Sequence, residues 1–94
     1  MEQWKSHTTD RLVDTLLKIE NQEECYALLF DLCTVKEIKD MAQRLEVALL
    51  LKEGKSYQEI SSGTGVSAAT ISRVSRCLNY GSGGYKMALE KMED

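Results

Sequence analysis

The sequence predicts an all-α fold of about six helices that includes a helix-turn-helix. Apolar residues recur at helical spacing along most of the chain, there is no proline, and several segments carry capping residues or glycines that begin and end helices. At 94 residues, one domain spanning 1–94 is expected. A chain this short leaves much of its apolar surface exposed when it folds alone, which favours a core shared with a second copy.

The region of about residues 9–53 is expected to contain the dimerisation helices. From Thr9 to Ile19, leucines and a valine form an apolar stripe with the spacing of one helix face. Asn21 is suited to cap a second helix, and acidic residues follow it in the first turn, where they interact favourably with the helix dipole.

A third, longer helix is expected from Val35 to the neighbourhood of Gly54. The preceding Thr34 and Glu37 have the spacing of a capping box, and glycine readily adopts the left-handed conformation that ends helices. The apolar run Val47 to Leu51 covers more than one face of this helix, so we expect burial on both sides, as in a dimer core.

The helix-turn-helix is expected over about residues 57–78, in the stretch YQEISSGTGVSAATISRVSR. Ser56 and Glu59 form a second capping box that begins its first helix, Gly65 provides the turn, and Ser67 caps a helix from Ala68 to about Leu78. Ser61 is the small residue expected where the two helices touch. The expected packing positions are Ile60, Val66, Ile71 and Val74.

The outward face of this second helix has the residue types of a DNA-reading surface. Small residues allow close approach, alanine methyls can contact thymine methyls, hydroxyls can reach bases or phosphates, and arginine can bind guanine or phosphate. The alternative is two packed helices with a small polar surface. The candidate DNA-binding residues are Ser67, Ala68, Ala69, Thr70, Ser72, Arg73 and Arg76.

The glycine-rich stretch from Asn79 to Gly84 is expected to be irregular, and a last amphipathic helix is expected over about 84–93. Tyr80 is interpreted as an aromatic residue that plugs the end of a helix pair, with stacking or a phosphate contact as the alternative.

Charge is distributed unevenly along a chain whose net charge is −3. Residues 1–35 hold three basic and seven acidic side chains, a net charge of −4, whereas residues 54–86 hold four basic and one acidic, a net charge of +3. Because local field governs attraction to phosphates, the acidic total is compatible with DNA binding.

The sequence offers no pattern typical of an enzyme or a metal site. The cysteines, Cys25, Cys33 and Cys77, form no CxxC pair, the single histidine, His7, lies far from them, and no nucleophile has a nearby base. We therefore expect neither catalysis nor a metal. Without a long apolar run or a secretory signal, the protein is expected to be cytoplasmic and to have no membrane partner.

Two stretches, LCTVKEIKDMAQRLEVALLLKEGKSYQEI and TGVSAATISRVSRCLNYG, together resemble the Trp repressor superfamily, and more closely its YerC/YecD branch. The resemblance covers about residues 10–92. It implies an intertwined, all-helical homodimer that presents its two reading heads to successive major grooves of double-stranded DNA. It also implies a sequence-specific transcriptional regulator, for which steric repression is the simplest mechanism.

The resemblance also bears on a possible effector. Arg44 and Arg73 match the two arginines that hold the amino-acid corepressor in the family, but Val74 stands at a glycine position and Cys77 at a serine position. An isopropyl group blocks the space of the indole, and the lost hydroxyl removes an acceptor for the ammonium group. Tryptophan is therefore not expected as effector. Either Val74 fills the pocket and holds the reading head in place, or a different small ligand binds.

The leading hypothesis is a homodimeric DNA-binding repressor with the helix that begins at Ser67 in the major groove. The alternative is a protein-interaction module that docks a partner through the same surface, and the salt dependence of binding separates the two. Arg44 is expected to contact a phosphate or to form an ion pair within the dimer, with a solvated surface charge as the alternative.

Overall fold

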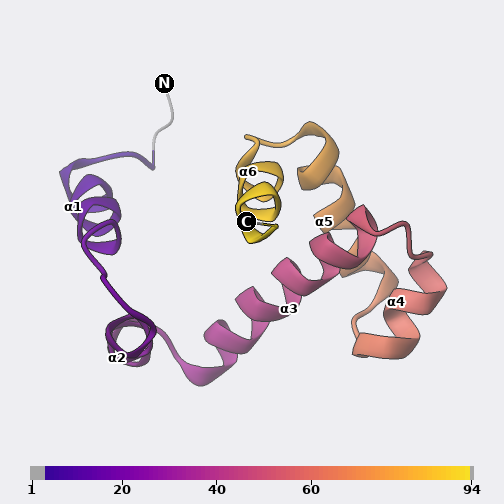
Figure 1. Cartoon of the computed structure of the whole chain (residues 1–94), viewed down its shortest axis with the longest axis horizontal. Helices are drawn as coiled ribbons and strands as arrows, with labels where there is room; N and C mark the ends of the chain where they lie inside the picture. Colours follow the sequence, from indigo (N-terminus) through magenta and orange to yellow (C-terminus); the bar gives the residue numbers. More distant parts are fainter. Residues whose placement is uncertain (1–3, 94) are drawn as a thin grey trace. The chain divides into compact units, whose positions relative to one another are not determined.

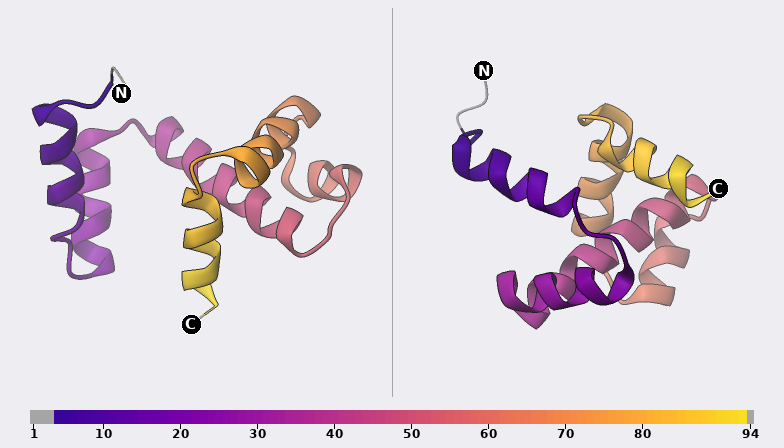
Figure 2. Two further views of the ribbon diagram at one scale, coloured as in Figure 1. Left: turned by 90° about the horizontal axis from the view of Figure 1, so that it is seen from above. Right: turned by 60° about the vertical axis from the view of Figure 1, so that its left-hand side comes forward.

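The computed structural model describes residues 4–93, which form six α-helices and no strand, and the chain is therefore all-α as predicted. Its described residues divide into two compact units, one ending at Val35 and the other beginning at Lys36. Figure 1 and Figure 2 show the helices. The helices are α1 (His7–Leu16), α2 (Gln22–Leu32), α3 (Val35–Lys52), α4 (Tyr57–Thr64), α5 (Ala68–Tyr80) and α6 (Gly84–Met92).

The N-terminal unit has well-defined helix starts, but none of its described residues, 4–35, is buried. Ser6 caps α1 and forms a capping box with Thr9, so the helix begins two residues before the expected start at Thr9. Asn21 caps α2, where its side chain accepts a hydrogen bond of 2.8 Å from the backbone N–H of Glu24. Neither helix contains a buried residue, and large apolar side chains such as Phe30 and Leu17 are exposed.

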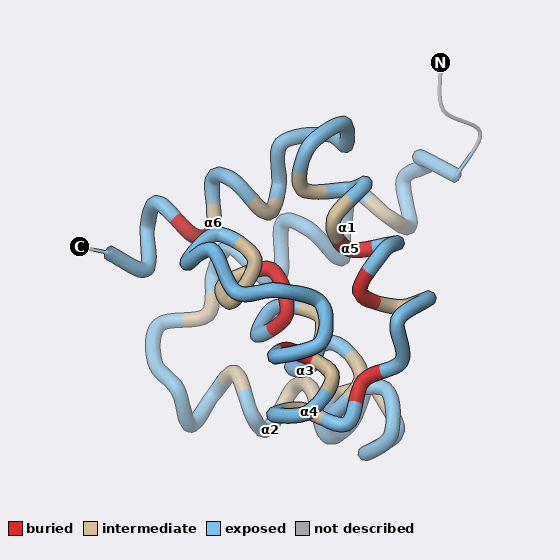
Figure 3. The backbone as a smooth tube through the Cα atoms, turned by 90° about the vertical axis from the view of Figure 1, so that its right-hand side faces the viewer, coloured by how far each residue is buried: buried red, intermediate tan, exposed pale blue. Residues whose placement is uncertain are grey.

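The C-terminal unit holds the hydrophobic core. Buried residues from α3, α4, α5, α6 and the turn between α4 and α5 meet in one cluster (Figure 3). Complete burial of a branched aliphatic side chain contributes about 1.5–3 kcal/mol, so these few residues dominate the stability of the unit. The cluster consists of Val47, Ala48, Ile60, Val66, Ile71, Val74 and Leu89.

The apolar run at the end of α3 is used largely within this core. Val47 and Ala48 are fully buried, and Leu49, Leu50 and Leu51 are half-buried against the cluster. The helix ends where the sequence predicts, because Gly54 adopts a left-handed conformation with φ of 88°.

The helix-turn-helix forms with the expected local chemistry. Ser56 and Glu59 complete the capping box of α4, Gly65 ends that helix at φ of 77°, and Ser67 caps α5 through the N–H of Thr70. The hydroxyl of Thr64 donates to the carbonyl of Ile60 at 2.7 Å and accepts from the N–H of Val66 at 3.2 Å. A threonine is accommodated at the turn because its hydroxyl links the last turn of α4 to the backbone of the turn that follows it.

The expectation that the irregular stretch begins at Asn79 is wrong, whereas the last helix begins at the expected position, residue 84. Asn79 and Tyr80 form the last residues of α5, and α6 begins at Gly84. Only Gly81, Ser82 and Gly83 lie outside the two helices. Gly81 follows α5 in an extended conformation, where an added Cβ would lie 2.4 Å from the carbonyl oxygen of Cys77, and Gly83 is left-handed at φ of 90°.

Replacing Gly65 by alanine should destabilise the fold, because a side chain in the left-handed conformation costs about 1–2 kcal/mol. Gly63→Ala is the matched control, since Gly63 lies inside α4 with open space around its Cβ position. Alanine is favoured there by about 0.5–1 kcal/mol. Urea unfolding at one fixed protein concentration should shift in opposite directions for the two variants. Equal shifts would show that the φ of Gly65 does not control stability.

Glu59 should make the stability depend on pH. The backbone N–H of Ser56 donates to its carboxylate at 3.0 Å, and this hydrogen bond, followed by one from the Ser56 hydroxyl, lowers the pKa of Glu59 below its ordinary value of 4.5. A depressed folded-state pKa stabilises the fold above the unfolded pKa, and this contribution is lost as the pH falls through the folded pKa.

Glu59→Gln retains an acceptor for the cap but cannot titrate. The urea midpoint of the wild type, relative to this variant, should therefore decline as the pH is lowered from 7 to below 4. All other carboxylates are common to both proteins, so their difference isolates Glu59. A difference that is constant with pH would contradict the assignment.

Candidate nucleic-acid interface

The two faces of α5 are clearly separated by burial. All four expected packing positions of the helix-turn-helix are buried in the core of the C-terminal unit. Six of the seven candidate DNA-binding residues are exposed, and Thr70 alone is half-buried. The hydroxyl of Ser67 lies 3.2 Å from that of Thr70, so the first turn of α5 presents two linked hydroxyl groups.

Two arginines continue this surface along α5. Arg73 and Arg76 lie one turn apart, and both are exposed. Neither guanidinium forms an ion pair or hydrogen bond within residues 4–93. Each therefore keeps its donors available for an external acceptor such as a phosphate oxygen or the edge of guanine.

A polar hollow of about 360 Å³ lies between α3 and the start of α5. From α3 it is lined by Lys36, Asp40, Gln43 and Arg44. The other wall consists of residues 65–67, Thr70 and Arg73. Lys36 donates to Asp40 at 2.8 Å, an i,i+4 pair on the surface of α3. Arg44 is half-buried and, like Arg73, has no partner in the part of the chain that the structure describes.

The four residues considered for an effector pocket separate into different environments. Arg44 and Arg73 line the hollow together. Val74 does not line it, because its side chain is 1% exposed and belongs to the hydrophobic core. Cys77 is exposed on α5 and is also absent from the lining.

Three lining residues of α3 were not expected from the sequence. Lys36, Asp40 and Gln43 fall on one face of the helix with Arg44, and this spacing was the available signal.

The interpretation of Tyr80 as a plug was wrong, since its side chain is 87% exposed at the end of α5.

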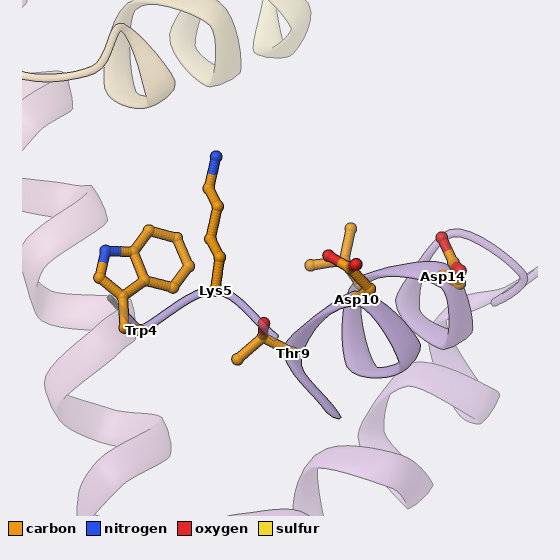
Figure 4. Close-up of a pocket in the computed structure, with 6 residues that line it drawn as sticks. Trp4, Lys5, Thr9, Asp10 and Asp14 are labelled. Carbon is orange, nitrogen blue, oxygen red and sulfur yellow. The ribbon is translucent and has the colours of Figure 1, made fainter. Parts of the chain in front are cut away.

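The N-terminal unit carries a separate hollow of about 440 Å³ beside the start of α1 (Figure 4). Trp4 lies at one end, with the ammonium of Lys5 5.6 Å from its ring centroid, and Asp10 and Asp14 lie at the other. The lining contains no histidine or cysteine.

Within residues 4–93, no group of three metal-ligating side chains converges. No helix in that range has the length and apolar character needed to span a membrane.

Comparison with known proteins agrees with this architecture. Residues 7–93 match the family described as Trp repressor protein. The uncharacterized protein YerC of Bacillus subtilis is 52% identical over 85 residues, which cover 90% of this chain and 82% of that protein.

Two crystal structures have the same fold over nearly the whole chain. One is that of a candidate Trp repressor from Staphylococcus aureus, with a TM-score of 0.90 and 46% identity, covering 95% of this chain and 89% of the other. The second is a TrpR-like protein from Eubacterium eligens, with a TM-score of 0.91 and 40% identity, covering 95% and 92%. The chain therefore belongs to the Trp repressor family, in its YerC-like branch, a family of DNA-binding regulators rather than enzymes.

Proposed function

We propose that this protein is a sequence-specific transcriptional repressor that binds double-stranded DNA as a homodimer, with the first turns of α5 in the major groove. The proposal rests on the difference in burial between the two faces of α5. Its inner residues are fixed in the core, while small, hydroxyl and arginine side chains remain on the free face.

The free face suits close contact with base edges. Ser67, Ala68 and Ala69 are all exposed and small, so the backbone of the first turn can approach the floor of the groove. Arg73 and Arg76 follow on the exposed face of α5, and we assign them to phosphates at the edge of the groove, where such contacts fix register and orientation.

The local charge supports this orientation. The region from residue 54 to residue 86 has a net charge of +3, whereas residues 1–35 have a net charge of −4. The reading surface is attracted to phosphates and the N-terminal region is repelled. With few cations in total, non-specific binding should be weak and should fall quickly with salt.

The dimer is supported by the apolar side chains of the N-terminal unit, which are not buried within the single chain. Neither α1 nor α2 buries a residue, although the exposed apolar side chains include Leu12, Val13, Leu16, Tyr26 and Phe30. Isolated helices of this length are marginal in water, so α1 and α2 need a surface that covers their apolar stripes. A second copy supplies one, and two reading heads then reach two half-sites about one helical turn apart.

Binding without a small effector is supported by Val74. Its side chain packs in the cluster that joins α5 to α3 and α4, so α5 is held by apolar contacts of the chain itself. No ligand is required to fix the reading helix. We therefore infer that tryptophan is not needed for DNA binding.

The function is tested by selecting binding sites from a random duplex library with the purified protein and no added ligand. Enrichment of an inverted repeat with half-sites about one helical turn apart would support the proposal. The affinity for the selected site should fall steeply with salt, with a log-log slope set by the number of phosphates contacted. No enrichment, together with capture of a protein through the α5 surface, would favour the protein-interaction module instead.

Arg73→Ala should weaken binding to the selected site by about 1–3 kcal/mol, because it removes a guanidinium from the reading face. Arg11→Ala, a change of the same size and charge in α1, is the control and should leave the affinity nearly unchanged. Fluorescence anisotropy with both variants at one salt concentration makes the comparison. Unchanged affinity of Arg73→Ala would exclude this residue from the interface.

Phe30→Glu should shift the protein from dimer to monomer and reduce its helix content, because a carboxylate would have to be buried in the shared core. Asp31→Ala, at the next and already polar position of α2, serves as the control. Sedimentation across a range of concentrations and circular dichroism report the two effects. A wild-type monomer with intact helical content at every concentration would contradict the dimer.

A further inference from the structure

The polar hollow beside the reading helix gathers cations from two different helices. Lys36 and Arg44 come from α3 and Arg73 from α5, against the single carboxylate of Asp40. Arg73 takes part in both the hollow and the exposed face of α5. The hollow is therefore continuous with the surface assigned to DNA.

The charges in the hollow are only partly compensated. Asp40 pairs with Lys36 at 2.8 Å, which leaves the guanidinium groups of Arg44 and Arg73 without a partner among the described residues. The Lys36 side chain is 84% exposed, and exposed pairs of this kind contribute about 0–1 kcal/mol. The pair can therefore open at little cost when a stronger anion arrives.

The composition of the lining indicates which kind of anion fits. Besides Gly65 and Val66, every lining residue is charged, an amide or a hydroxyl, and Val66 belongs to the core. Organic ligands are usually held by predominantly apolar and aromatic walls, which this hollow lacks. Ammonium, guanidinium and amide donors instead suit the oxygens of a phosphate group.

We propose that this hollow seats a backbone phosphate of the DNA strand that borders the groove entered by α5. Lys36, Gln43 and Arg44 make α3 a second DNA-contacting element, outside the helix-turn-helix. These side chains position the reading head and do not read bases. The inference rests on the proposed DNA-binding function.

Asp40 acquires a defined role in this arrangement. Its carboxylate holds Lys36 in the free protein and lies in the same hollow as the incoming phosphate. On binding, Lys36 exchanges the carboxylate for the phosphate, and the negative charge of Asp40 opposes the step. Asp40 therefore limits the affinity for DNA.

The test compares three substitutions on α3 at several salt concentrations, using the full-length protein and its selected site. Lys36→Gln should weaken binding several-fold, equally for selected and unrelated duplexes, and should lower the salt slope by about 1. Asp40→Asn should strengthen binding several-fold. Lys39 lies about one turn from Lys36 on α3 but does not line the hollow. Lys39→Gln therefore removes the same charge outside the hollow, and its effect on DNA binding should be much smaller.

Several results would overturn the phosphate seat while leaving the proposed function intact. Equal losses of DNA affinity in Lys36→Gln and Lys39→Gln would show that both lysines act through the overall positive charge and not through a phosphate bound in the hollow. Weaker binding by Asp40→Asn, with unchanged circular dichroism and thermal unfolding, would show that the carboxylate assists binding. A wild-type protein that selects no DNA would instead refute the proposed function itself.

Inorganic phosphate distinguishes a DNA phosphate from a free one. Titrating phosphate alone into the protein, monitored by NMR shifts of Arg44 and Arg73, should give no saturation at millimolar concentration, because a single exposed anion gains little without the rest of the duplex. Tight saturable binding of phosphate, combined with a salt slope that Lys36→Gln leaves unchanged, would assign the hollow to a free small anion and overturn the proposal.

Discussion

The fixed position of α5 depends on the burial of its inner face. Ile71 and Val74 are at most 1% exposed and pack in the same cluster as Val47 and Ala48 of α3 and Ile60 of α4. A helix committed to a core on one side leaves its opposite side free and oriented. The exposed hydroxyl groups and arginines of α5 are presented together because these apolar residues leave the helix no other orientation.

The parts of the fold that follow from local chemistry could be predicted from the sequence. The caps at Ser56 and Ser67 and the left-handed glycines at 54 and 65 act within a few residues of themselves, so their consequences do not depend on distant segments. Two predicted helix boundaries were wrong, because Asn79 was given too much weight as a helix end and Ser6 was overlooked as a helix cap. Helix α5 continues to Tyr80 because nothing before Gly81 prevents it, and α1 begins earlier because Ser6 caps it.

The candidate site shows the same division between local and tertiary information. The exposed residues of α5 follow from helical periodicity once its apolar face is recognised. The hollow does not, because it exists only where α3 passes the start of α5, and no spacing within either helix specifies that approach. For the same reason, the family resemblance grouped Arg44, Arg73, Val74 and Cys77, whereas the structure brings only the two arginines into the hollow.

The two units differ in how many apolar side chains they bury, and this difference is consistent with the proposed dimer. The C-terminal unit contains all seven buried apolar residues of the described chain, so α5 is held by a core within its own unit. The N-terminal unit contains none of them, and its apolar side chains remain available for association. On the proposed function, the net charge of −4 over residues 1–35 is repelled by phosphates, while the net charge of +3 over residues 54–86 is attracted to them. On the proposed function, this separation of association from recognition lets an acidic protein approach DNA with the face that carries the arginines of α5.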